Sequence, residues 1–114
     1  MNPIRKKRIE KELLKLISNT LEFKIRDKRL AFVSVTAVKI SEDLAYAKIY
    51  YSTLSKAKIK DVEKGLSKAG GFIKNEIAKA KILRTIPELR FFYDDTQDKA
   101  ERIEEILKKI HNEE

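Results

Sequence analysis

The stretch from Ile59 to Leu83 most constrains the fold, because it has the apolar spacing of a long amphipathic helix with two adjacent glycines in its middle. Apolar or small residues recur every three or four positions, which predicts one helix face packed against a core. They are Ile59, Val62, Leu66, Ala69, Ile73, Ile77 and Ala80. Each glycine inside a helix costs about 1 kcal/mol relative to alanine. We therefore predict that two helices meet at a kink formed by Ala69, Gly70 and Gly71.

The opposite half of this predicted helical stretch is cationic. On a helical wheel of about 100° per residue, five lysines lie away from the apolar face, and Gly71 lies among them. They are Lys60, Lys64, Lys68, Lys74 and Lys81. The glycine leaves bare backbone where a bulky polyanion can approach closely, which favours a binding surface. The alternative is a solvated lysine face with no ligand.

A second cationic segment follows the predicted start of the first helix. Asn2 and Pro3 are typical of the N-cap and the first helical position, and the apolar spacing continues to about Phe23. The first turns of this helix hold Arg5, Lys6, Lys7 and Arg8. Cations there oppose the helix dipole, so we expect them, together with Arg84, to contact phosphate. The alternative is a frayed and solvated helix end.

The rest of the chain predicts a small three-stranded sheet. Residues Phe32–Ile40 and Leu44–Ser52 alternate in polarity and are joined by a short polar loop, which is typical of an antiparallel hairpin. On the second strand, Tyr46, Lys48 and Tyr50 share the side opposite the expected core. We interpret the tyrosines as packing or surface residues, with stacking on RNA bases as the alternative.

A third strand and a last helix complete the predicted order. Residues Leu89–Tyr93 follow Pro87 as a strand, and apolar spacing from Ala100 to Ile110 predicts a helix. The long helical connection should place the third strand parallel to one of the first two. The fold class is therefore α+β, with helices on one face of the sheet.

The charge balance points to a polyanionic partner. The 114 residues carry a formal net charge of +8, which suits nucleic acid or an anionic membrane surface. No apolar run approaches the roughly 20 residues that span a bilayer, the first residues show no signal-peptide pattern, and cysteine is absent. We expect one soluble, cytoplasmic domain that does not act at a membrane.

Few residues suit catalysis. Asp94, Asp95 and Asp98 form the one carboxylate cluster, which a metal-dependent nuclease would need for Mg²⁺, although capping of the last helix is the simpler interpretation. His111 is the single histidine, so neither a zinc site nor a catalytic triad is expected. We predict no catalytic residue, metal, cofactor or small-molecule substrate.

Three blocks of residues carry a resemblance to a known family. The predicted order α-β-β-α-α-β is that of type II KH domains, which bind RNA, and the blocks resemble the bacterial ribosome-binding factor A family. The first block is Val35-Thr36, then Val38-Lys39-Ile40-Ser41 with Asp43-Leu44, and then Ala47 with Tyr50 and Ser52. The second is Ala69-x-Gly71-Phe72-Ile73, and the third is Leu83-Arg84-x-x-Pro87-Glu88-Leu89-x-Phe91-x-x-Asp94. The segment from Ile25 to Leu30 also resembles a turn of that family, with Lys28 where proline is common.

This resemblance implies a single KH-like ribosome-binding domain over residues 1–114, with a helix-kink-helix at Ala69 and Gly71. It implies a non-enzymatic, monomeric assembly factor that binds the small (30S) ribosomal subunit and its 16S rRNA near the 5′ end. It also implies a role in late maturation, rRNA processing and cold adaptation. The alternative is a general RNA-binding KH-like module without a ribosomal role.

Overall fold

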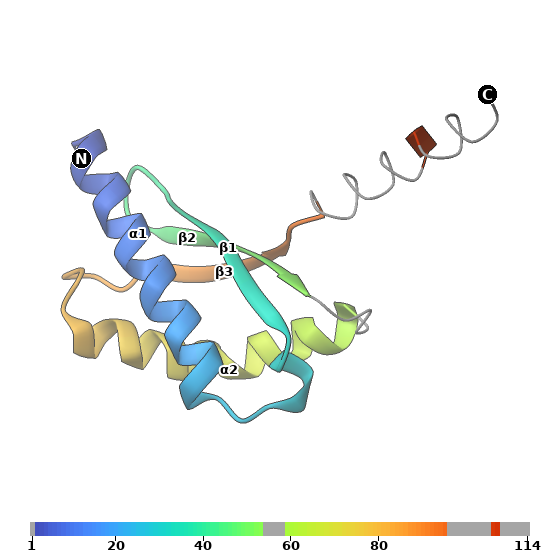
Figure 1. Ribbon diagram of the computed structural model, residues 1–114. Coiled ribbons are helices and arrows are strands. Elements are labelled where there is room, and N and C mark those ends of the chain that lie inside the picture. The colour runs from blue at the N-terminus through green and yellow to red at the C-terminus, as the bar shows by residue number, and fades with distance from the viewer. Residues whose placement is uncertain (1, 54–58, 96–105, 108–114) are drawn as a thin grey trace.

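The computed structural model describes residues 2–53, 59–95 and 106–107, which form two long helices and a three-stranded sheet (Figure 1). The elements in chain order are α1 (Pro3–Asn19), the π-helical turn η1 (Thr20–Lys24), the 3-10 helix η2 (Lys28–Leu30), β1 (Val33–Ile40), β2 (Tyr46–Thr53), α2 (Ile59–Ala80) and β3 (Glu88–Tyr93). The predicted last helix lies outside the described residues except for Ile106 and Leu107, which are helical and exposed.

The sheet has the predicted topology. The strand order is β1-β2-β3, with β1 antiparallel to β2 and β3 parallel to β2. Ile49 in the central strand pairs with Val38 on one side and Phe91 on the other. The register between β1 and β2 shifts between Val35 and Ala37, which marks a bulge in this edge strand.

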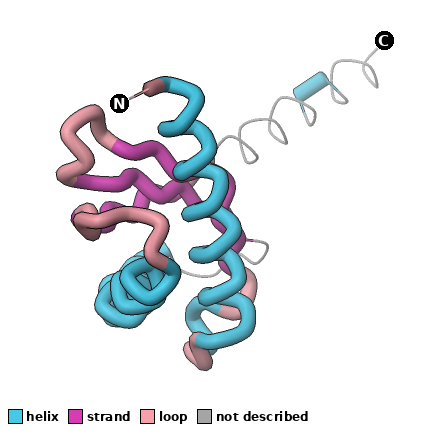
Figure 2. The backbone as a smooth tube through the Cα atoms, turned by 90° about the vertical axis from the view of Figure 1, so that its left-hand side faces the viewer, coloured by secondary structure: helices cyan, strands magenta, loops and turns pink. Residues whose placement is uncertain are grey.

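Both long helices pack on one face of the sheet and bury the predicted apolar positions. The core joins residues from α1, from the inner sides of β1 and β2, and from α2. Its fully buried members include Leu13, Ile17, Ile49, Tyr51, Val62, Leu66, Ile73 and Ile77. Figure 2 shows α2 nearly end-on while α1 runs down the view, so the two helices cross steeply over the sheet.

The prediction of two helices meeting at Ala69, Gly70 and Gly71 is wrong, because α2 is one continuous helix of 22 residues. No glycine in the chain has a positive φ, so the pair keeps an ordinary helical conformation. Buried residues occur on both sides of the glycines, including Leu66 and Ile73. Their packing outweighs the roughly 1 kcal/mol that each glycine costs a helix.

Helix α1 begins as predicted and is tied to the edge of the sheet. The side chain of Asn2 accepts a hydrogen bond from the Ile4 amide at 2.9 Å, which is the expected N-cap. Glu10 accepts the backbone N–H of Ile40 on β1 at 2.8 Å. β1 is an edge strand of the described sheet, so one side of its backbone has no neighbouring strand to bond. The Glu10 carboxylate supplies a hydrogen-bond acceptor for that side and joins α1 to the sheet.

Candidate nucleic-acid interface

The lysines predicted to face solvent on α2 are exposed along most of its length. We call Lys60, Lys64, Lys68 and Lys74 the lysine face. Because apolar residues occupy the buried side of the same helix, the ammonium groups necessarily project outward. The structure therefore confirms the exposure that the helical wheel predicts for these four residues.

The two other predicted cations of this region lie beyond the helix. Helix α2 ends at Ala80, so Lys81 is not helical and instead has a φ of 54°. A left-handed residue directly after the last turn is a common way to end a helix. Lys81 and Arg84 are both exposed in the connection that leads to β3.

No ion pair occupies the lysine face among the described residues. The neighbouring Lys79 differs, because its ammonium lies 3.6 Å from the carboxylate of Glu76. Glu76 is buried and also bonds Lys24 at 2.8 Å. The hydrogen bond from Lys24 is the largest reason that the pKa of Glu76 is lowered. The lysines of α2 therefore have two roles. Lys79 pairs with Glu76 of the same helix, whereas the lysine face forms an open cationic surface.

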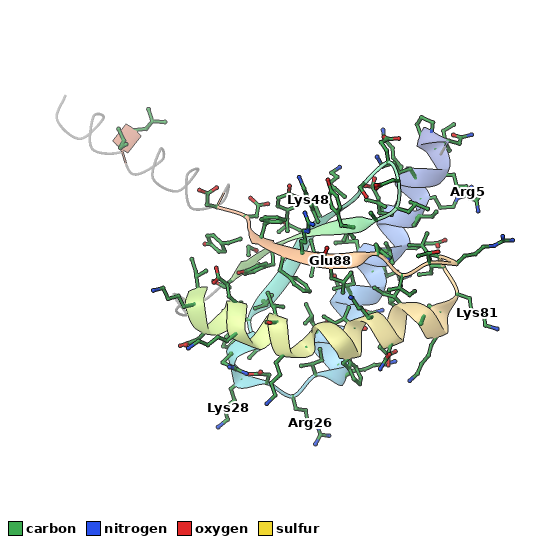
Figure 3. All side chains as sticks on the ribbon, turned by 180° about the vertical axis from the view of Figure 1, so that it is seen from behind. Arg5, Arg26, Lys28, Lys48, Lys81 and Glu88 are labelled. Atoms are coloured by element: carbon green, nitrogen blue, oxygen red, sulfur yellow. The ribbon has the colours of Figure 1, made fainter. Side chains whose placement is uncertain are left out.

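A loop of basic residues flanks α2 on one side. The chain between η1 and β1 packs against α2 at Gly65, where an added Cβ would lie 3.0 Å from Leu30 Cδ2 and 3.4 Å from Asp27 Oδ2. Figure 3 shows Arg26 and Lys28 projecting from this loop on the far side of α2 from the sheet. From the sequence this segment was predicted only as a turn, so Arg26 and Lys28 were not among the predicted RNA-binding residues. Both are exposed, and their positive charge was the one signal that could have identified them.

Asp27 does not cancel the charge of that loop, because it is already paired within it. Its carboxylate accepts a hydrogen bond from Arg29 Nη2 at 2.7 Å and another from the Arg29 backbone amide at 3.0 Å. The Arg29 side-chain bond is the largest of the causes that lower the pKa of Asp27 to about 2, and the charge of Lys68 contributes in the same direction. Arg26 and Lys28 therefore extend the positive surface next to Lys68.

An open groove of about 450 Å³ lies between α2 and the edge strand β3, on the flank of α2 opposite the loop with Arg26 and Lys28. Gly70 and Gly71 form part of its wall, and a Cβ added to either glycine would have no atom within 4 Å. The bare backbone that the sequence predicts is therefore present within one continuous helix. The groove is mixed in charge, however, since Lys74 lines it together with Glu63 and Glu88.

The N-terminal cations form a separate group. Arg5, Lys7 and Arg8 are exposed, whereas Lys6 is half-buried and lies 3.1 Å from Glu42 in an ion pair. Phosphate contact by this group stays a prediction, and Lys6 would have to leave Glu42 to take part in it. Figure 3 shows Arg5 at the same end of the molecule as Lys81. Figure 2 shows the start of α1, which holds this group, at the opposite end of the view from α2, so the group lies apart from the lysine face.

One of the carboxylates considered for a nuclease, Asp94, makes a contact with the sheet. Asp94 accepts a hydrogen bond from the hydroxyl of Thr36 at 2.9 Å, whereas Asp98 and His111 lie outside the described residues. Within residues 2–53, 59–95 and 106–107, no group of three or more His, Cys, Asp or Glu residues is placed to hold a metal ion. In the same residues no helix has the length and apolar character needed to cross a membrane.

The mixed three-stranded sheet with both helices on one face defines a type II KH-like α+β fold. The chain belongs to the ribosome-binding factor A family, whose model matches residues 5–107. Ribosome-binding factor A of Coxiella burnetii is 39% identical over 105 residues, which are 92% of this chain and 88% of that protein.

Two known structures share the fold. The crystal structure of ribosome-binding factor A from Thermus thermophilus matches with a TM-score of 0.71 and 23% identity, over 77% of this chain and 93% of that one. A homology model of the Thermus thermophilus factor, fitted into a cryo-EM map of its complex with 30S, matches with a TM-score of 0.64 and 22% identity, over 76% and 92% of the two chains.

Proposed function

We propose that this protein is a ribosome assembly factor that binds the small (30S) ribosomal subunit and its 16S rRNA near the 5′ end. Its membership of the ribosome-binding factor A family supports this role, as does the 30S complex of the Thermus thermophilus factor. On this proposal the protein acts in the cytoplasm as a monomeric, non-enzymatic domain spanning residues 1–114. It assists late maturation and rRNA processing, and its contribution is greatest during growth in the cold.

The observation that carries the proposal is the lysine face of α2, which is exposed and has no ion pair among the described residues. A protein cation that replaces the counterions of a phosphate releases them into solution, and this release favours binding at low salt. Contacts of this kind position a protein on RNA without reading its sequence. The fold and shape of the RNA then determine where a rigid row of lysines fits.

Charge reversal on α2 tests this interface. Lys64→Glu combined with Lys68→Glu should weaken co-sedimentation with 30S subunits strongly. It should also reduce the slope of log affinity against log salt by about 1.5 units, because each lost phosphate contact contributes about 0.7–0.9. The matched control is Lys11→Glu with Lys15→Glu, which changes two exposed lysines at the same spacing on α1. Equal effects of the two double variants would show that net charge, not the lysine face, controls binding.

A general nucleic-acid-binding module is the second candidate, because the lysine face itself contains nothing that selects one RNA sequence. Competition between 30S subunits and an unrelated folded RNA of similar length separates the two functions. Preference for the subunit supports the assembly factor, whereas equal affinity supports the general module. Labelled RNA incubated with the protein and Mg²⁺ should remain intact, and cleavage would contradict the non-enzymatic role.

A further inference from the structure

The side of the sheet opposite the helices carries an ordered set of cations and aromatic rings. Lys39 on β1 pairs with Lys48 on β2, and Lys48 pairs in turn with Arg90 on β3, so three cations form one row across the sheet. The adjacent row contains Tyr50 and Phe92, which also pair with each other. We call these five residues and Tyr46 the outer sheet face.

The rings of this face lie side by side at the surface. The ring centroids of Tyr50 and Phe92 are 5.7 Å apart with an angle of 32° between their planes, and Phe92 is 41% exposed. The guanidinium of Arg90 lies 4.3 Å from the centre of the Tyr46 ring. Figure 3 shows Lys48 pointing away from α2, which packs on the other side of the sheet. The face therefore combines flat apolar surfaces with unburied positive charge.

We propose that the outer sheet face binds a short segment of single-stranded RNA by stacking its bases on Tyr50 and Phe92, while Lys39, Lys48 and Arg90 contact its phosphates. Neighbouring strands lie about 4.8 Å apart, so the cation row spans about 10 Å, and it lies about 6.6 Å from the aromatic row. An unpaired nucleotide presents a flat base and a phosphate at such spacings. Base stacking on aromatic residues of an open sheet is an established mode of RNA binding in other folds.

Charge complementarity favours RNA over an apolar protein segment as the occupant. Covering the central row with an uncharged partner would remove the ammonium groups of Lys39 and Lys48 from water without compensation. The acidic residues on this side lie at the two ends of the sheet and already have partners. Glu88 accepts a hydrogen bond from Arg90 at 3.3 Å, and Asp94 accepts one from Thr36 at 2.9 Å. The middle of the face is left positive.

Binding of 5′-fluorescein-labelled octauridylate, measured by fluorescence anisotropy on the full chain, tests the proposal. Tyr50→Leu with Phe92→Leu should weaken binding by about tenfold per ring removed, because each base loses its stacking partner. The matched control is Phe23→Leu, which removes a ring that is 74% exposed and lies on η1, outside the sheet. Its affinity for octauridylate should equal that of the unchanged protein.

A second measurement keeps the test valid if the double variant unfolds. In the unchanged protein, NMR signals of the Tyr50 and Phe92 rings should shift on addition of octauridylate, while those of Phe23 should not. Unchanged affinity in a folded Tyr50→Leu, Phe92→Leu variant would overturn the proposal. So would ring contacts with residues 96–114 that persist in the presence of octauridylate, because the face would then be covered by the chain itself.

The inference rests on the proposed function only in taking RNA as the ligand, and the two can fail separately. Lys64→Glu with Lys68→Glu should lose affinity for 30S subunits and keep affinity for octauridylate. If this variant binds 30S normally while octauridylate still depends on Tyr50 and Phe92, the α2 interface fails and the outer sheet face remains. If only the octauridylate result fails, the α2 interface is unaffected.

Discussion

Substitution of Gly71 separates what α2 needs for folding from what it offers to a ligand. Gly71 is exposed, has no positive φ, and leaves open space within 4 Å of an added Cβ. Alanine at such a position should therefore gain the full difference in helix propensity. We expect Gly71→Ala to raise the free energy of unfolding by about 1 kcal/mol and the melting temperature by about 4 °C.

The longer side chain of Gly71→Leu should be tolerated by the helix for the same reason, since leucine is also a strong helix former. It would, however, fill part of the groove between α2 and β3, beside Lys74 and Phe91. We expect this variant to unfold at a urea concentration equal to or above that of the unchanged protein and to bind 30S subunits more weakly. Urea unfolding followed by circular dichroism and co-sedimentation with 30S measure the two effects on the same preparation.

Gly65→Ala is the matched control within α2. A Cβ at Gly65 would approach Leu30 Cδ2 to 3.0 Å and Leu30 Cγ to 3.2 Å, and Leu30 is buried. Overpacking of this kind typically costs about 1–3 kcal/mol, which offsets or exceeds the gain in helix propensity. Destabilisation of the protein by Gly71→Ala to the same extent as by Gly65→Ala would show that Gly71 is not in open space. Full 30S binding by Gly71→Leu would instead remove the groove from the interface.

Two further predictions concern hydrogen-bonded carboxylates. The pKa of Asp27 is lowered to about 2, chiefly by the hydrogen bond from the Arg29 side chain. The ionised carboxylate therefore stabilises the folded state fully above its unfolded pKa near 4. This contribution is lost as the pH falls toward about 2. Asp27→Asn should therefore lower the urea midpoint at about pH 7, with a difference from the unchanged protein that shrinks between about pH 4 and about pH 2; a constant difference would contradict the ion-pair origin. Glu10→Ala should cost about 1 kcal/mol by removing the acceptor of the Ile40 amide, and hydrogen exchange should accelerate at that amide; unchanged protection there would show that the bond is not needed.

The sequence predicted the elements of the fold because their signals are local. The spacing of Val62, Leu66, Ile73 and Ile77 identifies the buried side of α2, and all four are buried. The interpretation of Gly70-Gly71 as a break failed because helix propensity is a weak local term that packing overrides. The glycine with a steric role is Gly65, and only the tertiary contact with Leu30 reveals it.

The same distinction applies to the candidate interface. The exposure of the lysine face follows from helical periodicity, so the sequence was sufficient to predict it. The pairing of Lys6 with Glu42 joins residues 36 positions apart, and no local pattern reports such a contact. Arg26 and Lys28 extend the positive surface only because their loop folds back onto α2, which is likewise a long-range event.

The two proposed RNA surfaces lie on opposite sides of the fold, and this arrangement gives a non-enzymatic protein a way to influence RNA structure. The lysine face acts through charge and shape, whereas the outer sheet face acts through stacking on unpaired bases. One RNA arrangement can present a folded segment to the lysine face and a single strand to the outer sheet face, so that it binds both surfaces. Other arrangements bind only one of the two surfaces. The difference in affinity between these arrangements is the free energy by which the bound protein shifts their equilibrium. Maturation would then be assisted by selection of one RNA conformation, with Tyr50 and Phe92 detecting the single strand and Lys64 and Lys68 holding the folded segment.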